Sequence, residues 1–160
     1  MKPNTKEKGI VLKSLLAAWI TVVFGTSILL AAFTTVDSST YHPNAFLNFL
    51  RQVWEIADEM GPAVKISLIL MFTLLTYCIK SLNLHKSKAL AYLINMSLAC
   101  VAVALVLAFL PAGYSRGFGI GLTGIRFDKS VLPYYLMGAL LEGFVFTYVY
   151  HRLSYKAIIS

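Results

Sequence analysis

A single glutamate, Glu142, interrupts an apolar run long enough to cross a membrane, in the stretch LMGALLEGFVF at residues 136–146. An ionisable side chain is unfavourable in hydrocarbon, so an acid in such a run marks a candidate functional site. At a helical rise of about 1.5 Å per residue, Glu142 lies about 13 Å beyond Pro133, near the middle of a bilayer. The chemistry expected of this position is proton or cation binding, or a hydrogen bond between helices.

The other apolar segments offer Glu142 no cation at its depth, because Lys65 and Lys80 fall at opposite ends of their segment. A carboxyl group far from water and without a cation favours its neutral form, which can donate one hydrogen bond. The polar side chains expected near it are Thr21, Thr26, Thr73 and Asn95. Three roles are open for Glu142: a structural bond between helices, a bond to a partner subunit, and a proton or cation site.

The composition predicts an all-α integral membrane protein. Of the 160 residues, 58% are hydrophobic and 13% are charged, whereas soluble domains contain about 45–50% apolar and about 25% charged residues. Four apolar segments approach the length of roughly 17 to 25 residues that spans a bilayer as a helix. A single polytopic domain, a bundle of four transmembrane helices, is therefore expected, with spans near residues 14–33, 62–79, 89–110 and 131–150.

The distribution of basic residues predicts the orientation. One side of the predicted bundle carries Lys2, Lys6, Lys8, Lys13, Lys80, Lys86, Lys88, Arg152 and Lys156. Because basic residues are retained on the cytoplasmic side, both termini are expected in the cytoplasm, most simply at a bacterial inner membrane. The formal charge of +7 follows from this bias and from attraction to anionic lipid headgroups, so nucleic acid is not an expected partner.

Residues 44–60 predict an amphipathic helix on the extracytoplasmic side. Asn44 is a candidate N-cap, and Gly61-Pro62 is a candidate break before the second span. Apolar residues recur at helical spacing, while the polar side carries a candidate partner face of Arg51, Glu55, Asp58 and Glu59. Two interpretations are open: a helix that lies in the interface and covers the bundle, and a helix that binds a partner through its mostly acidic face.

The second extracytoplasmic segment, residues 111–130, is rich in glycine. It predicts a glycine-rich loop or a short β-hairpin, since GFGIG lacks the complete spacing and the context of a dinucleotide fingerprint. Its basic residues Arg116, Arg126 and Lys129 are expected to dock on the acidic helix.

Small residues at four-residue steps predict where helices pack closely. The first span carries Ala17, Thr21 and Gly25, and the fourth carries Ala139 and Gly143. Both ridges are expected to face other helices rather than lipid.

No catalytic constellation is found, since the chain has no HExxH, no GxSxG and no clustered metal ligands. We therefore expect a protein that is not an enzyme and that has no cofactor or metal. The function predicted from the sequence is binding to another membrane protein, as an accessory, regulatory or immunity-type subunit. The alternative is a small oligomeric transporter or proton-coupled channel that uses Glu142. The expected partners are the lipid bilayer and either a protein partner or further copies of this chain.

Overall fold

The computed structural model describes residues 5–33, 44–80, 87–109 and 131–159, which form α1 (Thr5–Phe33), α2 (Ala45–Glu59), α3 (Gly61–Lys80), α4 (Lys88–Phe109) and α6 (Leu132–Ile159). These described ranges contain helices and no strand. All but α2 are long and apolar enough to cross a membrane. This confirms that the described part of the chain is helical with four candidate spans, and it implies contact with a lipid bilayer. The predicted loop or hairpin at 111–130, with Arg116, Arg126 and Lys129, lies outside the described residues.

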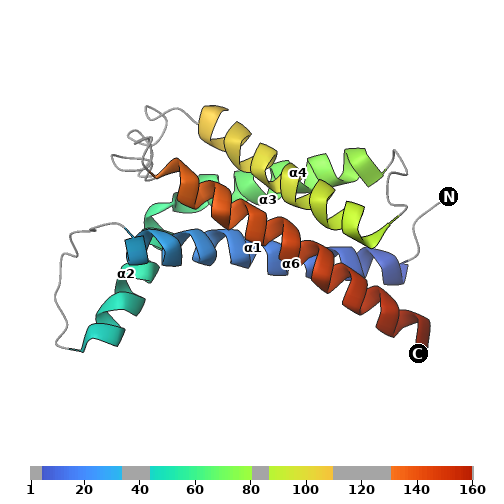
Figure 1. Cartoon of the computed structure of the whole chain (residues 1–160), viewed down its shortest axis with the longest axis horizontal. Coiled ribbons are helices and arrows are strands. Elements are labelled where there is room, and N and C mark those ends of the chain that lie inside the picture. Colours follow the sequence, from blue (N-terminus) through green and yellow to red (C-terminus); the bar gives the residue numbers. More distant parts are fainter. Residues whose placement is uncertain (1–4, 34–43, 81–86, 110–130, 160) are drawn as a thin grey trace.

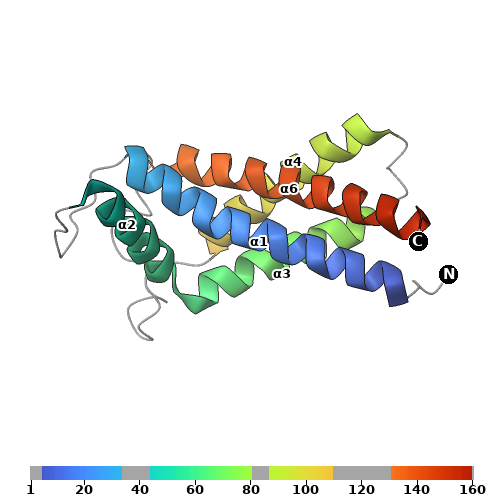
Figure 2. The ribbon, with the colours of Figure 1, turned by 90° about the horizontal axis from the view of Figure 1, so that it is seen from below.

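The four long helices form an up-and-down bundle (Figure 1). Helix α6 runs antiparallel to both α1 and α4 and packs more extensively on α1, while α3 packs mainly on α4. Helix α1 begins and α6 ends at one end of the bundle, here called the terminal end. At the other end, here called the α2 end, α2 runs obliquely to α1 and contacts it (Figure 2). Helix α6 is therefore the central element, with neighbours on two sides.

Polar caps fix the starts of two helices. The Asn44 Oδ1 accepts hydrogen bonds from the backbone N–H groups of Phe46 at 3.0 Å and Leu47 at 3.4 Å, which confirms the predicted N-cap of α2. The Ser87 hydroxyl oxygen accepts the N–H of Leu90 at 3.2 Å at the start of α4.

A glycine separates α2 from α3. Gly61 has a φ of 67°, a left-handed value that glycine adopts without steric penalty. Pro62 follows in the first turn of α3, where its missing N–H leaves no helical hydrogen bond unmade. The chain can therefore change direction at once, from the oblique α2 into a spanning helix.

Helix α2 divides its apolar side between the bundle and the molecular surface. Val53, Ile56 and Ala57 are buried, whereas the exposed apolar residues are Phe46, Leu47, Leu50 and Trp54. The Trp54 ring lies 6.2 Å from the ring of Phe24 in α1, measured between centroids. The exposed half is therefore continuous with the outer surface of α1, as expected of a helix in the membrane interface.

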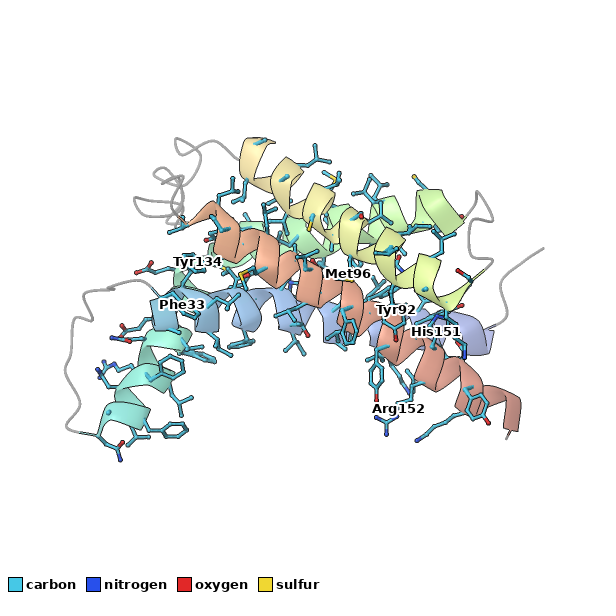
Figure 3. The ribbon with its side chains drawn as sticks, in the orientation of Figure 1. Phe33, Tyr92, Met96, Tyr134, His151 and Arg152 are labelled. Carbon is cyan, nitrogen blue, oxygen red and sulfur yellow. The ribbon has the colours of Figure 1, made fainter. Side chains whose placement is uncertain are left out.

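Aromatic pairs hold α6 near both of its ends. At the α2 end, Tyr134 stacks on Phe33 of α1 with ring centroids 5.9 Å apart. Toward the terminal end, His151 lies 6.2 Å from the ring of Tyr92 in α4. Figure 3 shows these two pairs far apart along the bundle, so α6 is fixed to α1 at one end and to α4 at the other.

Besides its packing on α4, helix α3 contacts α6 and α1. Phe72 meets Phe146 of α6 edge to face, with centroids 5.4 Å apart, a favoured geometry for aromatic rings. The Trp19 indole N–H of α1 donates to the backbone oxygen of Lys65 at 2.7 Å. Helix α3 is still the least covered span. Of the residues in its most apolar stretch, 22% are buried, against 39% in each of the other three spans.

Candidate functional site

Two glycines bring α1 and α4 against the same part of α6. A Cβ added at Gly138 would collide with the Thr26 hydroxyl of α1 and would lie 3.2 Å from the Thr26 Cβ. A Cβ at Gly143 would lie 2.5 Å from the Cα of Met96 and 2.6 Å from the backbone carbon of Asn95, both in α4. Met96 is labelled in Figure 3 where α4 crosses α6. Both approaches need a residue without a side chain.

Glu142 lies between these two crossings. It follows Gly138 by one helical turn and directly precedes Gly143, so it is placed on the sector of α6 between α1 and α4. The side chain is 1% exposed, and neither carboxyl oxygen has a hydrogen-bond partner among the described residues. The single chain thus encloses the carboxyl group instead of presenting it to lipid.

Asn95 and Thr147 extend the polar cluster toward the terminal end. The buried Asn95 side chain donates from Nδ2 to the Thr147 Oγ1 at 3.0 Å. Thr147 in turn donates to the backbone oxygen of Gly143 at 2.8 Å. The Asn95 Oδ1 has no partner in the described part of the chain, which leaves one buried acceptor beside the turn that carries Glu142.

Thr26 extends the cluster toward the α2 end. Its side chain is 0% exposed, and its hydroxyl has no hydrogen bond within the described ranges. Other hydroxyl groups in the spans donate to the carbonyl four residues earlier, namely those of Ser14, Thr21, Ser27, Thr73 and Thr76. The Thr26 oxygen instead faces Gly138. Its hydroxyl is thus directed at α6, one turn from Glu142.

We call Thr26, Asn95, Glu142 and Thr147 the Glu142 cluster. A buried polar group without a hydrogen bond costs about 1 to 3 kcal/mol of stability, and three members carry such atoms. The nearby Cys100 thiol of α4 donates to the backbone oxygen of Leu136 at 3.8 Å and lies within electrostatic range of Glu142. The cluster offers oxygen atoms and one ionisable proton, which suits a proton or a single cation. The described ranges contain no group of three or more His, Cys, Asp and Glu gathered for a metal, in this cluster or outside it.

Comparisons with protein families, with curated proteins and with solved structures find no match. The interpretation of the cluster therefore depends on its own chemistry.

The polar residues predicted near Glu142 separate into two groups. Thr21 and Thr73 are half-buried, and their hydroxyls donate within their own helices, to Ala17 at 2.8 Å and to Ile69 at 2.6 Å. Thr26 and Asn95 lie beside the turn of Glu142, as described above, and Asn95 donates to Thr147. Only part of the predicted set is therefore brought together.

The predicted packing ridges also differ from one another. Ala139 and Gly143 of α6 are buried, whereas Ala17, Thr21 and Gly25 of α1 are half-buried. A Cβ at Gly25 would make ordinary contact, at 3.8 Å, with a side-chain carbon of Leu141. The most buried ridge of α1 lies one residue further along the chain, at Ala18, Val22 and Thr26.

The candidate partner face of α2 lies on the side away from its buried residues. Arg51 pairs with Glu55 at 3.0 Å, an exposed pair of a kind worth about 0.3 to 0.5 kcal/mol. Asp58 and Glu59 are exposed. With three acidic residues and one arginine, these four residues are acidic in sum.

Sequence reasoning did not single out Gly138 and Thr147. Gly138 precedes Glu142 by four residues, and a small residue one turn from a buried acid is a usable signal of close approach. Thr147 carries no comparable signal, because its role depends on the depth of Asn95 in another helix.

Proposed function

We propose that this chain is a small oligomeric transporter or proton-coupled channel, in which Glu142 takes up and releases a proton or a cation. The observation that carries the proposal is the enclosed carboxyl group, 1% exposed and without a hydrogen bond to the described residues. A group whose only task is to join helices would have its bonding partner in place. A group that pairs with another subunit would lie at the surface of the bundle.

The proposed setting follows from the basic residues. In a bacterial inner membrane with both termini in the cytoplasm, Glu142 would lie near mid-membrane, between two aqueous compartments. Acids at such depth in transport proteins take part in proton relays. The residues that line the cluster come from α1, α4 and α6, so a change in the charge of Glu142 would act on all three helices.

Proton flux into liposomes tests this function. The purified chain is reconstituted with a pH-sensitive dye inside, and flux is driven by a potassium gradient with valinomycin. We expect wild-type liposomes to acidify faster than empty ones. Glu142→Gln is expected to fall to the rate of empty liposomes, because an amide does not bind and release a proton as a carboxyl group does. Thr76→Val is the control, since it removes a half-buried hydroxyl bonded within α3. Equal flux in wild type and Glu142→Gln would contradict the proposal.

The second candidate function is binding to another membrane protein, favoured by the poor coverage of α3. Its exposed face carries Ile66, Leu70, Leu74 and Tyr77. In a membrane, such a face packs on lipid or on another helix.

Cysteine cross-linking tests the second candidate. In a Cys78→Ala and Cys100→Ala background, Leu70→Cys is compared with Leu93→Cys, which places the thiol on an equally exposed position of α4 (63% and 64% exposed). Binding through α3 predicts a cross-linked species for Leu70→Cys that Leu93→Cys does not give. Equal cross-linking at both positions would remove the support for a partner on α3.

A further inference from the structure

We propose that Thr26 and Glu142 form one proton-binding site shared by α1 and α6. The two groups are not bonded to each other in the structure, where neither has a hydrogen-bond partner among the described residues, and we infer that a side-chain rotation lets the Thr26 hydroxyl bond the carboxyl group. This inference rests on the proposed function and narrows its ligand from a proton or cation to a proton. Thr26 is then a positioning residue, and Gly138 supplies the space in which the two side chains meet.

The geometry of the helix crossing brings the two groups to one place. The Thr26 hydroxyl lies where a side chain of residue 138 would begin. Side chains on an α-helix lean toward its N-terminus, so the Glu142 side chain is directed toward Gly138, one turn earlier. The hydroxyl approaches this point from α1 and the carboxyl group approaches it from α6.

The hydroxyl of Thr26 is chemically available for this bond. Neighbouring Ser27 uses its hydroxyl on the carbonyl of Val23 at 2.8 Å, whereas Thr26 makes no such bond within the described ranges. A hydroxyl can donate to a carboxylate and can accept from a carboxylic acid. The Thr26 hydroxyl can therefore bond both forms of Glu142, the carboxylate and the carboxylic acid. Proton binding changes the Glu142 carboxyl group from negative to neutral.

The groups around Glu142 favour a proton over a metal ion, because they supply few oxygen ligands. Helix α1 has no charged side chain between Lys13 and Phe33. Helix α3 contributes Lys65 near the α2 end, α4 contributes the Cys100 thiol, and α6 contributes Tyr135 two turns before Glu142. Calcium and magnesium take about six or more oxygen ligands. The cluster gives one carboxyl, the hydroxyls of two threonines and one amide oxygen, and one of those hydroxyls is already bonded to a backbone oxygen.

Infrared difference spectroscopy of the purified chain in lipid nanodiscs, between alkaline and acidic buffer, tests the site. We expect a carboxylic acid band that appears on acidification and is lost in Glu142→Gln. Thr26→Val keeps the branched shape without the hydroxyl, so the band is expected to shift to higher wavenumber as a hydrogen bond is lost. Thr26→Ser is expected to restore the wild-type position, and Ser27→Ala, a buried neighbour bonded within α1, is expected to leave it unchanged.

Two results would overturn this site. The first is a Glu142 band whose position is the same in wild type and Thr26→Val. The second is displacement of the Glu142 proton when sodium or magnesium chloride replaces choline chloride at constant ionic strength, which would assign a metal cation. Failure of the proposed transport function can be told apart from failure of this site. A Glu142 band that shifts in Thr26→Val, in a chain without liposome flux, rejects transport but not the site. Glu142-dependent flux with a Thr26-insensitive band rejects this site alone.

Discussion

Gly143→Ala is expected to destabilise the bundle by about 3 kcal/mol, whereas Gly25→Ala is expected to leave its stability unchanged or raise it by up to about 1 kcal/mol. The added methyl group at position 143 would lie 2.5 Å from the Cα of Met96 and 2.6 Å from the backbone carbon of Asn95. These are backbone atoms in the middle of α4, so no side chain can turn away to make room. Helix α4 would have to separate from α6, with loss of the Asn95 to Thr147 hydrogen bond.

Gly25→Ala is the matched control, because it adds the same methyl group to another span. Among the described residues, its Cβ would meet only the flexible end of Leu141, at 3.8 Å, and alanine favours helix over glycine by about 1 kcal/mol. Unfolding of both variants and the wild type is followed by tryptophan fluorescence in one detergent, with denaturant. Equal losses of stability at both positions, or none at either, would show that α4 and α6 do not meet closely at Gly143.

The sequence predicts the elements of this fold well, because each depends on a strong local signal. The spans are apolar over about the thickness of a bilayer, which no soluble arrangement explains. Helix α2 follows from its apolar spacing and from Asn44, whose side chain caps it. Glu142 is conspicuous as the one acid within a span. These features require no knowledge of how the helices pack.

The rotation of each spanning helix about its axis is harder to predict. Helix α1 is apolar on all sides, and in lipid an apolar side chain is equally well placed toward lipid or toward another helix. The ridge of Ala17, Thr21 and Gly25 therefore looks as suitable for packing as the ridge of Ala18, Val22 and Thr26. The structure buries the second ridge more completely.

The composition of the Glu142 cluster depends on that rotation. A turn of α1 by one residue would exchange Thr26 for Gly25 at the crossing with Gly138. The partner of a buried acid is thus decided by helix register and depth, which the sequence of one chain does not encode locally. Thr147 illustrates the same point, since its bond to Asn95 joins residues of α6 and α4.

Glu142→Met is expected to fold at least as stably as the wild type, with a free energy of unfolding unchanged or higher by about 1 to 3 kcal/mol. Methionine has a similar length, is flexible and removes the polar atoms that lack hydrogen bonds among the described residues. Replacing a buried ionisable group by an apolar one of similar volume is often neutral or stabilising. Thr26 would lose its proposed partner, but its hydroxyl could bond to the carbonyl of Val22, as neighbouring hydroxyls do in their own helices.

The same substitution is expected to abolish proton flux, so that stability and function change in opposite directions, as they do where an active site is maintained at the expense of stability. Glu142→Gln, which keeps polar atoms at the position, is expected to stay close to the wild type in stability while also losing flux. Denaturant unfolding and liposome flux are measured on the same preparations. A loss of more than about 1 kcal/mol in Glu142→Met, with Thr26→Val as stable as the wild type, would show that the carboxyl group holds α6 to its neighbours through a bond other than the one proposed to Thr26. In that case Glu142 is a structural residue, and the enclosed carboxyl group no longer supports a transport function.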